Sequence, residues 1–210
     1  MTHPKVLWFG KNVKASGGGK VRLKHRELFL SKSVKNASID VVERSRLAVR
    51  DTITKLRNPD SELKGVAQAF FYTDDPGDLQ TIMATLEQVN GGICGNVSFK
   101  TSNSSNKRLS SFTGEADNSN IEGYVANYAK RKGDIHVSRD YVLNNTYQAV
   151  RTFIHEASHR YADTTDETYF WPPSDNSNNW DYSEPGNLVK NKLLNNADSY
   201  AYFVMFLGYK

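Results

Sequence analysis

The chain has 210 residues, a formal net charge of +4 and a hydrophobic share of 38%, values typical of a folded globular protein. It lacks the run of roughly 18–20 apolar residues that a membrane-spanning helix requires, and its first residues do not resemble a secretory leader. Because Cys94 is the single cysteine, an intrachain disulfide framework is excluded. We expect one main domain, with no membrane span and no signal peptide.

Positive charge is concentrated at the N-terminus. Residues 1–32 contain eight Lys or Arg and one acid, so this segment carries +7 and the remaining residues carry −3. Such a segment can bind nucleic acid, anionic lipid or an acidic partner, but no aromatic-interleaved recognition motif accompanies the charges. We therefore divide the chain into a basic N-terminal arm or hairpin at 1–32 and a main domain at 33–210, and we expect no nucleic-acid partner.

The first half of the chain alternates short apolar runs with helical patterns. Strands are predicted near 6–9 and 21–30, on either side of a glycine-rich turn. Apolar residues at helical spacing predict a helix over 37–57, capped by Asn36 or Ser38. The run 66–72 is either a strand or the end of a helix.

A second helix is predicted over 79–89, ended by Asn90-Gly91-Gly92. Residues 101–120 are rich in Ser, Asn and Thr, which predicts a polar surface loop. A short strand is expected at 134–138 and a helix without Pro or Gly at 144–163. A long loop over 171–186 and a single final helix over 188–207 complete the prediction.

The predicted helix over 144–163 carries His155-Glu156-Ala157-Ser158-His159. Residues four apart on a helix lie on one face, so both imidazoles can reach one zinc ion at roughly 2.0–2.1 Å. Glu156 lies one step round the helix, beside the ion, where a general base for a zinc-bound water belongs. The segment predicts a catalytic zinc site.

A catalytic zinc site needs a third protein ligand, with the fourth position left for water. Downstream acids that could supply it are Asp163, Asp166 and Glu167. Asp163 continues the helical line, but three ligands along one straight helix would span about 12 Å. The helix must therefore end and the chain must turn back, which Thr164 and Thr165 would allow before Asp166.

His155-Glu-x-x-His159 followed by Thr164-x-Asp166-x-x-Tyr169 resembles the deuterolysin-like aspzincin metalloendopeptidases, whose lysine-specific members share this pattern. The block 196–203 resembles the closing helix of that family, and the strand at 134–138 lies where zincins place a substrate-binding edge strand. The likeness covers about residues 120–207, and residues 1–32 have no counterpart in it.

The resemblance implies a role for each matched residue. His155, His159 and Asp166 would bind one Zn²⁺, Glu156 would activate the water, and Tyr169 would donate a hydrogen bond to the oxyanion. Asp198 would orient a ligand histidine, or else be an ordinary surface or capping acid.

Three features depart from the family pattern. Asp163 replaces its first glycine, Phe170 replaces its last, and the interval from His159 to Asp166 is shorter, so Asp163 stays a rival ligand. Acids that could favour lysine substrates are Asp181 and Glu184. Secreted fungal members carry disulfides, which this chain cannot form, so the resemblance implies a bacterial branch and secretion by a leaderless route.

The predicted fold is α+β and zincin-like, with a small twisted sheet packed on the motif helix, an edge strand near 135–137 and a mostly helical remainder.

The predicted function is a zinc-dependent endopeptidase, a monomer acting on protein or peptide. One alternative is a secreted antibacterial toxin that hydrolyses cell-wall peptides or one specific protein, with an immunity or delivery partner. Another is a non-catalytic metal-containing binding protein that uses the basic arm. Glu156 argues against this non-catalytic alternative, because a structural metal site has no use for a carboxylate beside the ion.

Overall fold

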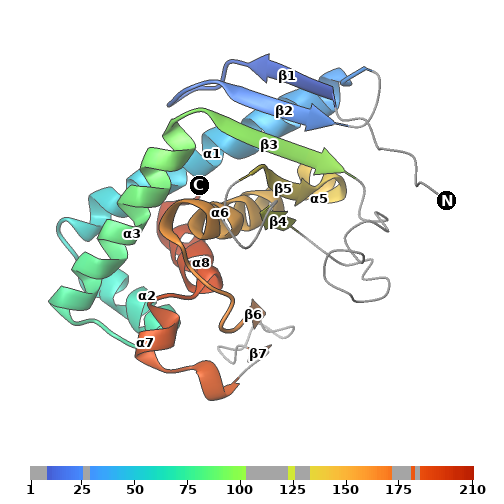
Figure 1. The fold of residues 1–210 in the computed structure, drawn as a ribbon. Helices are drawn as coiled ribbons and strands as arrows, with labels where there is room; N and C mark the ends of the chain where they lie inside the picture. The colour runs from blue at the N-terminus through green and yellow to red at the C-terminus, as the bar shows by residue number, and fades with distance from the viewer. Residues whose placement is uncertain (1–8, 26–28, 103–122, 126–132, 172–180, 183–184) are drawn as a thin grey trace.

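The computed structural model describes residues 9–25, 29–102, 123–125, 133–171, 181–182 and 185–210 (Figure 1). The strands of its main sheet are β1 (Phe9–Val13), β2 (Val21–His25), β3 (Val97–Ser102), β4 (Gly123–Val125) and β5 (Ile135–Ser138). Its helices are α1 (Lys32–Leu56), α2 (Ser61–Phe71), α3 (Pro76–Cys94), α5 (Arg139–Asn144), α6 (Thr146–Ala162), α7 (Lys190–Leu193) and α8 (Ala197–Gly208). A two-stranded ribbon of β6 (Phe170–Trp171) and β7 (Asp181–Tyr182) and a 3-10 turn at Pro185–Asn187 complete the described elements.

The five strands form one sheet in the order β1-β2-β3-β5-β4. Strands β2, β3 and β5 are parallel, and the outer strands β1 and β4 run antiparallel to their neighbours. Because side chains alternate along a strand, Val21 and Leu23 are buried while Arg22 is exposed on the opposite face. The buried face of the sheet packs on the helices, as Phe99 does edge-on against Phe153 of α6.

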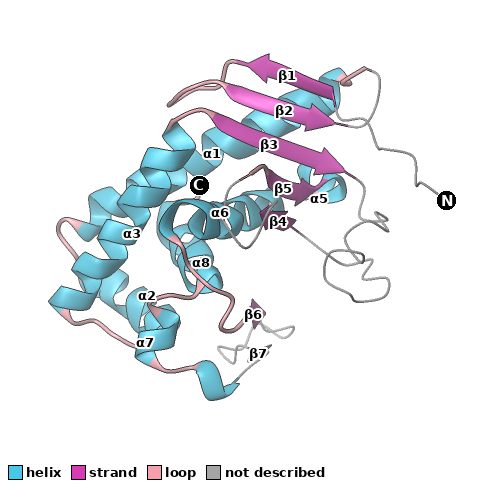
Figure 2. Cartoon of the chain, in the orientation of Figure 1, coloured by secondary structure: helices cyan, strands magenta, loops and turns pink. Residues whose placement is uncertain are grey.

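Helix α6 lies at the centre of the molecule, with the sheet on one side and helices around the rest (Figure 2). It packs against β4, β5, α1, α3 and α8. From Ala149 to His159 every side chain is buried, so the helix has no solvent-facing stripe over its second and third turns. Polar side chains on α6 are therefore held in fixed positions by packing.

The described part of the basic N-terminal segment contributes two strands to the main sheet. Strands β1 and β2 form an antiparallel hairpin, and β2 pairs with β3 over four residue pairs from Val21–Val97 to Lys24–Lys100. The sequence did not predict β3, which supplies the connection between hairpin and core. The division of the chain at residues 32 and 33 stays a prediction.

The predicted helix at 37–57 begins five residues earlier than expected. Ser31, rather than Asn36 or Ser38, caps it, and the Ser31 hydroxyl accepts from the backbone N–H of Val34 at 3.3 Å. The ambiguous run at 66–72 is the end of α2, which stops where Tyr72 adopts a left-handed conformation with φ of 55°.

The predicted stop of the second helix at Asn90-Gly91-Gly92 is wrong, because α3 continues to Cys94. A Cβ at Gly92 would overlap the ring of Tyr161 on α6, whereas a Cβ at Gly91 would have no neighbour within 4 Å. Gly92 therefore serves the close approach of α3 and α6 rather than ending a helix.

The predicted edge strand at 135–137 is also placed wrongly. Strand β5 lies inside the sheet, with β3 on one side and β4 antiparallel on the other. Strand β4 has no second neighbour among the described strands, so it is the edge on that side. A pattern of apolar residues cannot reveal this order, because pairing partners come from distant parts of the chain.

The single final helix predicted over 188–207 is two helices, α7 and α8, separated at Asn195 and Asn196. The predicted loop at 101–120 lies mostly outside the described residues, as does most of the loop at 171–186. Across the described residues, no helix combines the length and apolar character needed to cross a bilayer.

Candidate metal centre

The end of α6 redirects the chain toward the two histidines. The helix ends at Asp163, which has φ of 59° and whose backbone N–H bonds to Ser158 O. A left-handed residue at this point favours glycine, and Asp is among the few other residues that adopt it readily. After this turn, residues Thr164 to Asp166 run back along the helix. The sequence predicts such a turn if an acid of this segment is the third ligand.

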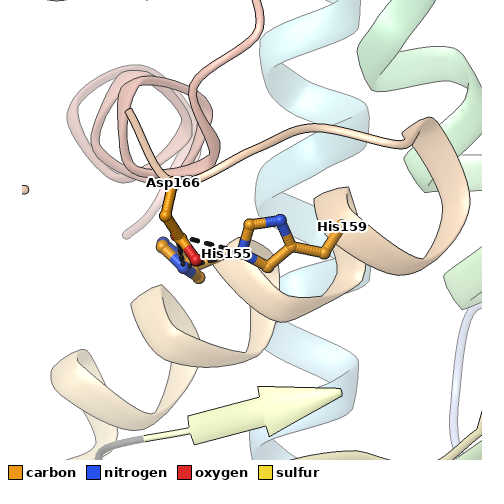
Figure 3. Close-up of side chains that lie close together, drawn as sticks. All are labelled: His155, His159 and Asp166. Carbon is orange, nitrogen blue, oxygen red and sulfur yellow. Dashed lines mark hydrogen bonds and ion pairs between the residues drawn. The ribbon is translucent and has the colours of Figure 1, made fainter. Parts of the chain in front are cut away.

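His155, His159 and Asp166 point their side chains at one another (Figure 3). Oδ1 of Asp166 lies 3.1 Å from Nε2 of His155 and 3.1 Å from Nε2 of His159. The two Nε2 atoms are themselves 3.1 Å apart. These three atoms form a triangle with equal sides.

The triangle fits a zinc ion. A tetrahedral ion about 2.0–2.1 Å from each ligand atom separates those atoms by roughly 3.3 Å. Two imidazole nitrogens and one carboxylate oxygen are ligand types that zinc accepts. The carboxylate of Asp166 is 28% exposed while both imidazoles are buried, so one side of the triangle faces solvent.

The other ring nitrogen of each histidine is held by an acceptor. Nδ1 of His155 lies 3.1 Å from Oδ1 of Asp198, and Nδ1 of His159 lies 2.8 Å from the carbonyl oxygen of Thr164. A carboxylate and a carbonyl can only accept, so each Nδ1 carries a hydrogen. Both Nε2 atoms are then the ones available to a metal.

Asp198 joins three parts of the chain. It is fully buried at the start of α8, and its Oδ1 also accepts from Arg151 of α6 at 3.0 Å. Its Oδ2 accepts from the backbone N–H of Phe170 at 2.7 Å. This buried carboxylate is thus fully hydrogen-bonded, and it holds α8, the motif helix and the segment after Asp166 together.

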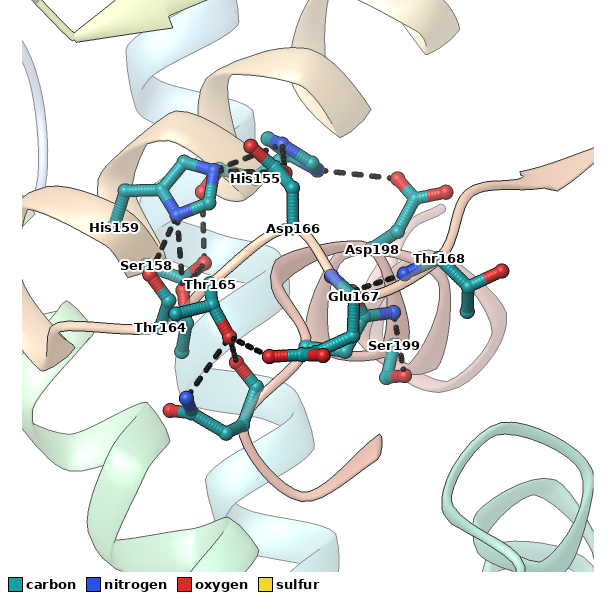
Figure 4. A network of polar contacts seen from close by, with 12 residues as sticks. His155, Ser158, His159, Thr164, Thr165, Asp166, Glu167, Thr168, Asp198 and Ser199 are labelled. Carbon is teal, nitrogen blue, oxygen red and sulfur yellow. Dashed lines mark hydrogen bonds and ion pairs between the residues drawn. The ribbon is translucent and has the colours of Figure 1, made fainter. Parts of the chain in front are cut away.

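The break between α7 and α8 anchors the segment that carries Asp166 (Figure 4). The backbone N–H of Thr165 donates to Asn195 O at 2.7 Å, and that of Ala197 donates to Thr165 O at 2.9 Å. Oδ1 of Asn196 accepts from the N–H groups of Glu167 and Thr168 at 3.0 and 3.3 Å. A continuous helix over 188–207 would keep these backbone groups for itself, so the break is a requirement of the site.

Without a metal, the site carries opposite charges on His155 and Asp166. Burial lowers the pKa of His155, but hydrogen bonds to Asp166 and Asp198 outweigh it and raise that pKa to about 10. Burial raises the pKa of Asp166, and its bonds to both imidazoles reverse this and hold it well below the usual range. Asp166 is therefore ionised at neutral pH, as a metal ligand must be.

Glu156 lies on the face of α6 that packs against the edge strand. It is buried, and burial raises the pKa of its carboxyl group. A Cβ added to Gly123 of β4 would come within 3.1 Å of Cγ of Glu156 and would overlap Cγ2 of Thr152. The glycine thus leaves room for the Glu156 side chain beneath the strand.

Tyr169 lies over the first histidine. Its ring stacks on that of His155 with centroids 6.0 Å apart and an angle of 15° between the planes. The side chain is 41% exposed, so it reaches from the site into solvent. Burial of the phenol and the nearby carboxylates of Asp166 and Glu156 raise the pKa of Tyr169, which keeps its hydroxyl protonated.

Not every candidate from the sequence joins the group. Asp163 is exposed at the helix end, and Glu167 accepts from the hydroxyl of Thr165 at 2.9 Å instead. Glu184 lies outside the described residues, and so does the side chain of Asp181. Sequence reasoning missed Thr164 O, Arg151 and Asn196, although Asn196 and Asp198 stand together in the block that resembled the family.

Fold and side chains together define a zincin-like α+β structure in which two histidines of the central helix meet an aspartate from the segment that follows it. Comparison of the sequence found no matching family model and no matching curated protein. Among solved structures, the chain is similar to a zinc peptidase from Grifola frondosa, with a TM-score of 0.56 and 17% sequence identity, covering 84% of this chain and 96% of that one. This likeness confirms the predicted fold class, and the function has to be argued from the site.

Proposed function

We propose that the chain is a zinc-dependent endopeptidase in which His155, His159 and Asp166 bind one Zn²⁺. The observation that carries the proposal is the triangle of Nε2, Nε2 and Oδ1 atoms, 3.1 Å on each side, with one side open to solvent. The likeness in fold to a zinc peptidase supports the same conclusion.

Glu156 is proposed as the general base and acid. A zinc ion held by His155, His159 and Asp166 would supply a Lewis acid that polarises the peptide carbonyl and acidifies the attacking water. The carboxylate of Glu156 then accepts the proton of that water and delivers it to the leaving amine. Burial, which raises the pKa of Glu156, favours this role because the protonated form must persist long enough to act as an acid.

Tyr169 is proposed as the donor to the oxyanion of the tetrahedral intermediate. Its raised pKa keeps the phenol protonated at neutral pH, and its stacking on His155 holds the hydroxyl-bearing ring beside the site. A hydrogen-bond donor aimed at developing negative charge is usually a large contribution to the rate.

The position of β4 supports an endopeptidase rather than an exopeptidase. This strand is the edge of the described sheet, and Gly123 on it touches the space around Glu156. An extended peptide can add to such an edge through backbone hydrogen bonds, which requires no free terminus. The proposed substrate is therefore an internal stretch of a protein or peptide in extended form.

A non-catalytic metal-binding role is supported less well. A structural zinc site closes its fourth position with protein and gains nothing from a buried carboxylate beside the metal. The toxin alternative concerns the substrate rather than the chemistry, and it differs from a general peptidase only in the range of bonds cleaved. Lysine specificity, a bacterial origin and secretion without a leader stay predictions.

The experiment that tests the proposal is digestion of a complex peptide mixture, read by mass spectrometry. The wild type should produce new cleavages that a chelator abolishes, and Glu156→Gln should produce none while retaining zinc. The matched control is Asp163→Asn, which changes an exposed acid at a left-handed position that Asn also adopts. Equal cleavage by wild type and Glu156→Gln would reject the mechanism.

The ligand assignment is tested by metal content. We expect about one zinc per wild-type chain, and loss of zinc in His155→Ala and Asp166→Ala. Asp163→Asn should keep full zinc. Loss of zinc from Asp163→Asn, with retention in Asp166→Ala, would exchange the two acids as the third ligand.

A further inference from the structure

A cavity of about 430 Å³ lies beside the first residues of β2, β3 and β5. Its lining shares no residue with the candidate metal centre. These three strands are parallel, so their N-terminal ends meet at one end of the sheet. The volume is within the range of roughly 300–1,000 Å³ that is usual for small-ligand sites. The cavity draws part of its lining from the basic N-terminal segment, which the proposed peptidase activity does not use.

The lining of the cavity is strongly cationic. Lys20 directly precedes β2, Arg22 and Lys24 lie on it, and Arg160 comes from the last turn of α6. The one acid in the described lining is Asp134, whose Oδ2 lies 2.8 Å from Nζ of Lys24. The charges of Lys24 and Asp134 cancel. Lys20, Arg22 and Arg160 then give the described lining a net charge of +3.

Two polar atoms of the lining are buried without a hydrogen-bond partner in the described structure, Nε of Arg160 and Oγ of Ser98. The guanidinium of Arg160 is otherwise fixed, because it donates to the carbonyl of Gly133 and lies 5.1 Å from the ring centroid of Tyr161. Buried donors without an acceptor cost free energy, which a ligand rich in acceptors would offset. Two such atoms in one cationic cavity therefore indicate an anionic ligand.

We propose that this cavity binds a small phosphate-type oxyanion, either inorganic phosphate or the phosphate monoester of a small molecule. Phosphate oxygens accept several hydrogen bonds at once and match the fork of an arginine. The phosphate charge of about −2 complements the cations of the lining better than the single negative charge of a carboxylate would. The cavity volume of about 430 Å³ matches a small ligand. None of the residues involved belongs to the metal centre, so the inference stands or falls independently of the peptidase proposal.

The test is a titration of the zinc-loaded, ¹⁵N-labelled chain with inorganic phosphate at constant ionic strength, followed by NMR. The amide signals of Ser98 and Asp134 should shift and saturate. The double variant Lys20→Gln/Arg22→Gln, at two exposed positions, should weaken this binding at least about ten-fold, because each cation supplies a charge-assisted contact. Lys64→Gln, an exposed cation on α2, is the matched control and should bind like the wild type.

Phosphate that reaches the zinc ion would perturb amides around His159 equally in all variants, which separates it from binding in the cavity. Inorganic phosphate is then added to samples that already contain a phosphate monoester, such as glycerol phosphate. This competition shows which of the two ligands binds the cavity more tightly. Unsaturable shifts, or equal affinity in the double variant with thermal unfolding unchanged, would overturn the proposal. Binding of a short oligonucleotide at Ser98 and Asp134 without any binding of inorganic phosphate would also overturn it.

Discussion

Nδ1 of His155 lies 3.1 Å from Oδ1 of Asp198, a carboxylate that is fully buried at the start of α8. The two residues are 43 positions apart, and the contact decides which nitrogen of His155 faces Asp166. Because Asp198 also accepts from Arg151 and from the N–H of Phe170, it couples the orientation of the imidazole to the packing of three segments.

Replacement of this carboxylate should weaken the metal site. We expect Asp198→Asn to lower zinc affinity by about 10–100-fold, the range usual for partners of metal-bound histidines. The amide can still accept one hydrogen bond, but the change removes the carboxylate that forms a buried ion pair with Arg151, so thermal stability should fall as well. Chelator competition measures the affinity. An affinity equal to that of Asp163→Asn would show that Asp198 is structural only.

Zinc binding should release protons. Below about pH 10 the metal-free chain holds a proton on His155, whose pKa is raised to about 10, whereas a zinc ligand must be neutral. Zinc and proton therefore compete, so the apparent affinity should fall about tenfold for each unit that the pH drops below about 10. Calorimetric titrations at pH 7.5 in buffers of different ionisation enthalpy should give about one proton released per zinc. Release of none would contradict the raised pKa.

Gly123→Ala should reduce activity without removing the metal. The added Cβ would overlap Cγ2 of Thr152 and approach Cγ of Glu156 to 3.1 Å, so strand β4 or the carboxylate must move. Displacement of a catalytic group by about 1 Å can cost up to about 100-fold in rate. We expect kcat to fall at least about ten-fold with zinc content unchanged. Gly91→Ala, where a Cβ meets nothing within 4 Å, is the control and should keep full activity.

Adjacent glycines of α3 should respond in opposite directions. Gly91→Ala should raise stability by about 0.5–1 kcal/mol, because alanine restricts the unfolded chain and nothing opposes its Cβ. Gly92→Ala should lower stability by about 1–3 kcal/mol, because its Cβ would overlap the ring of Tyr161. Urea unfolding of both variants measures the difference. Equal effects would mean that α3 and α6 do not pack as closely as described.

Helical regions were the most predictable from sequence, and their ends the least. The periodicity that predicted 37–57 and 144–163 is a local property, so α1 and α6 were found with errors of a few residues. The end of α3 was misplaced because Gly91 and Gly92 look alike in sequence, although only Gly92 faces another helix. Strand β3 went unnoticed because its apolar residues are few and its partners lie far away in the chain.

The sequence by itself determined that His155 and His159 share a helix face, with Glu156 one step away, because the spacing of i and i+4 depends only on the helical repeat. It left open which acid completes the group. The tertiary structure places Asp166, rather than Asp163, beside the two histidines, by a left-handed turn at Asp163 and by hydrogen bonds from the α7–α8 break to the segment of Asp166.

The order of the strands, with β4 rather than β5 at the edge, was likewise settled only in three dimensions. So was the assembly of a cationic cavity from β2, β3 and α6. Helical spacing depends only on residues that are close together in the sequence. The position of Asp166, the order of the strands and the cavity depend instead on contacts between residues that are distant in the chain.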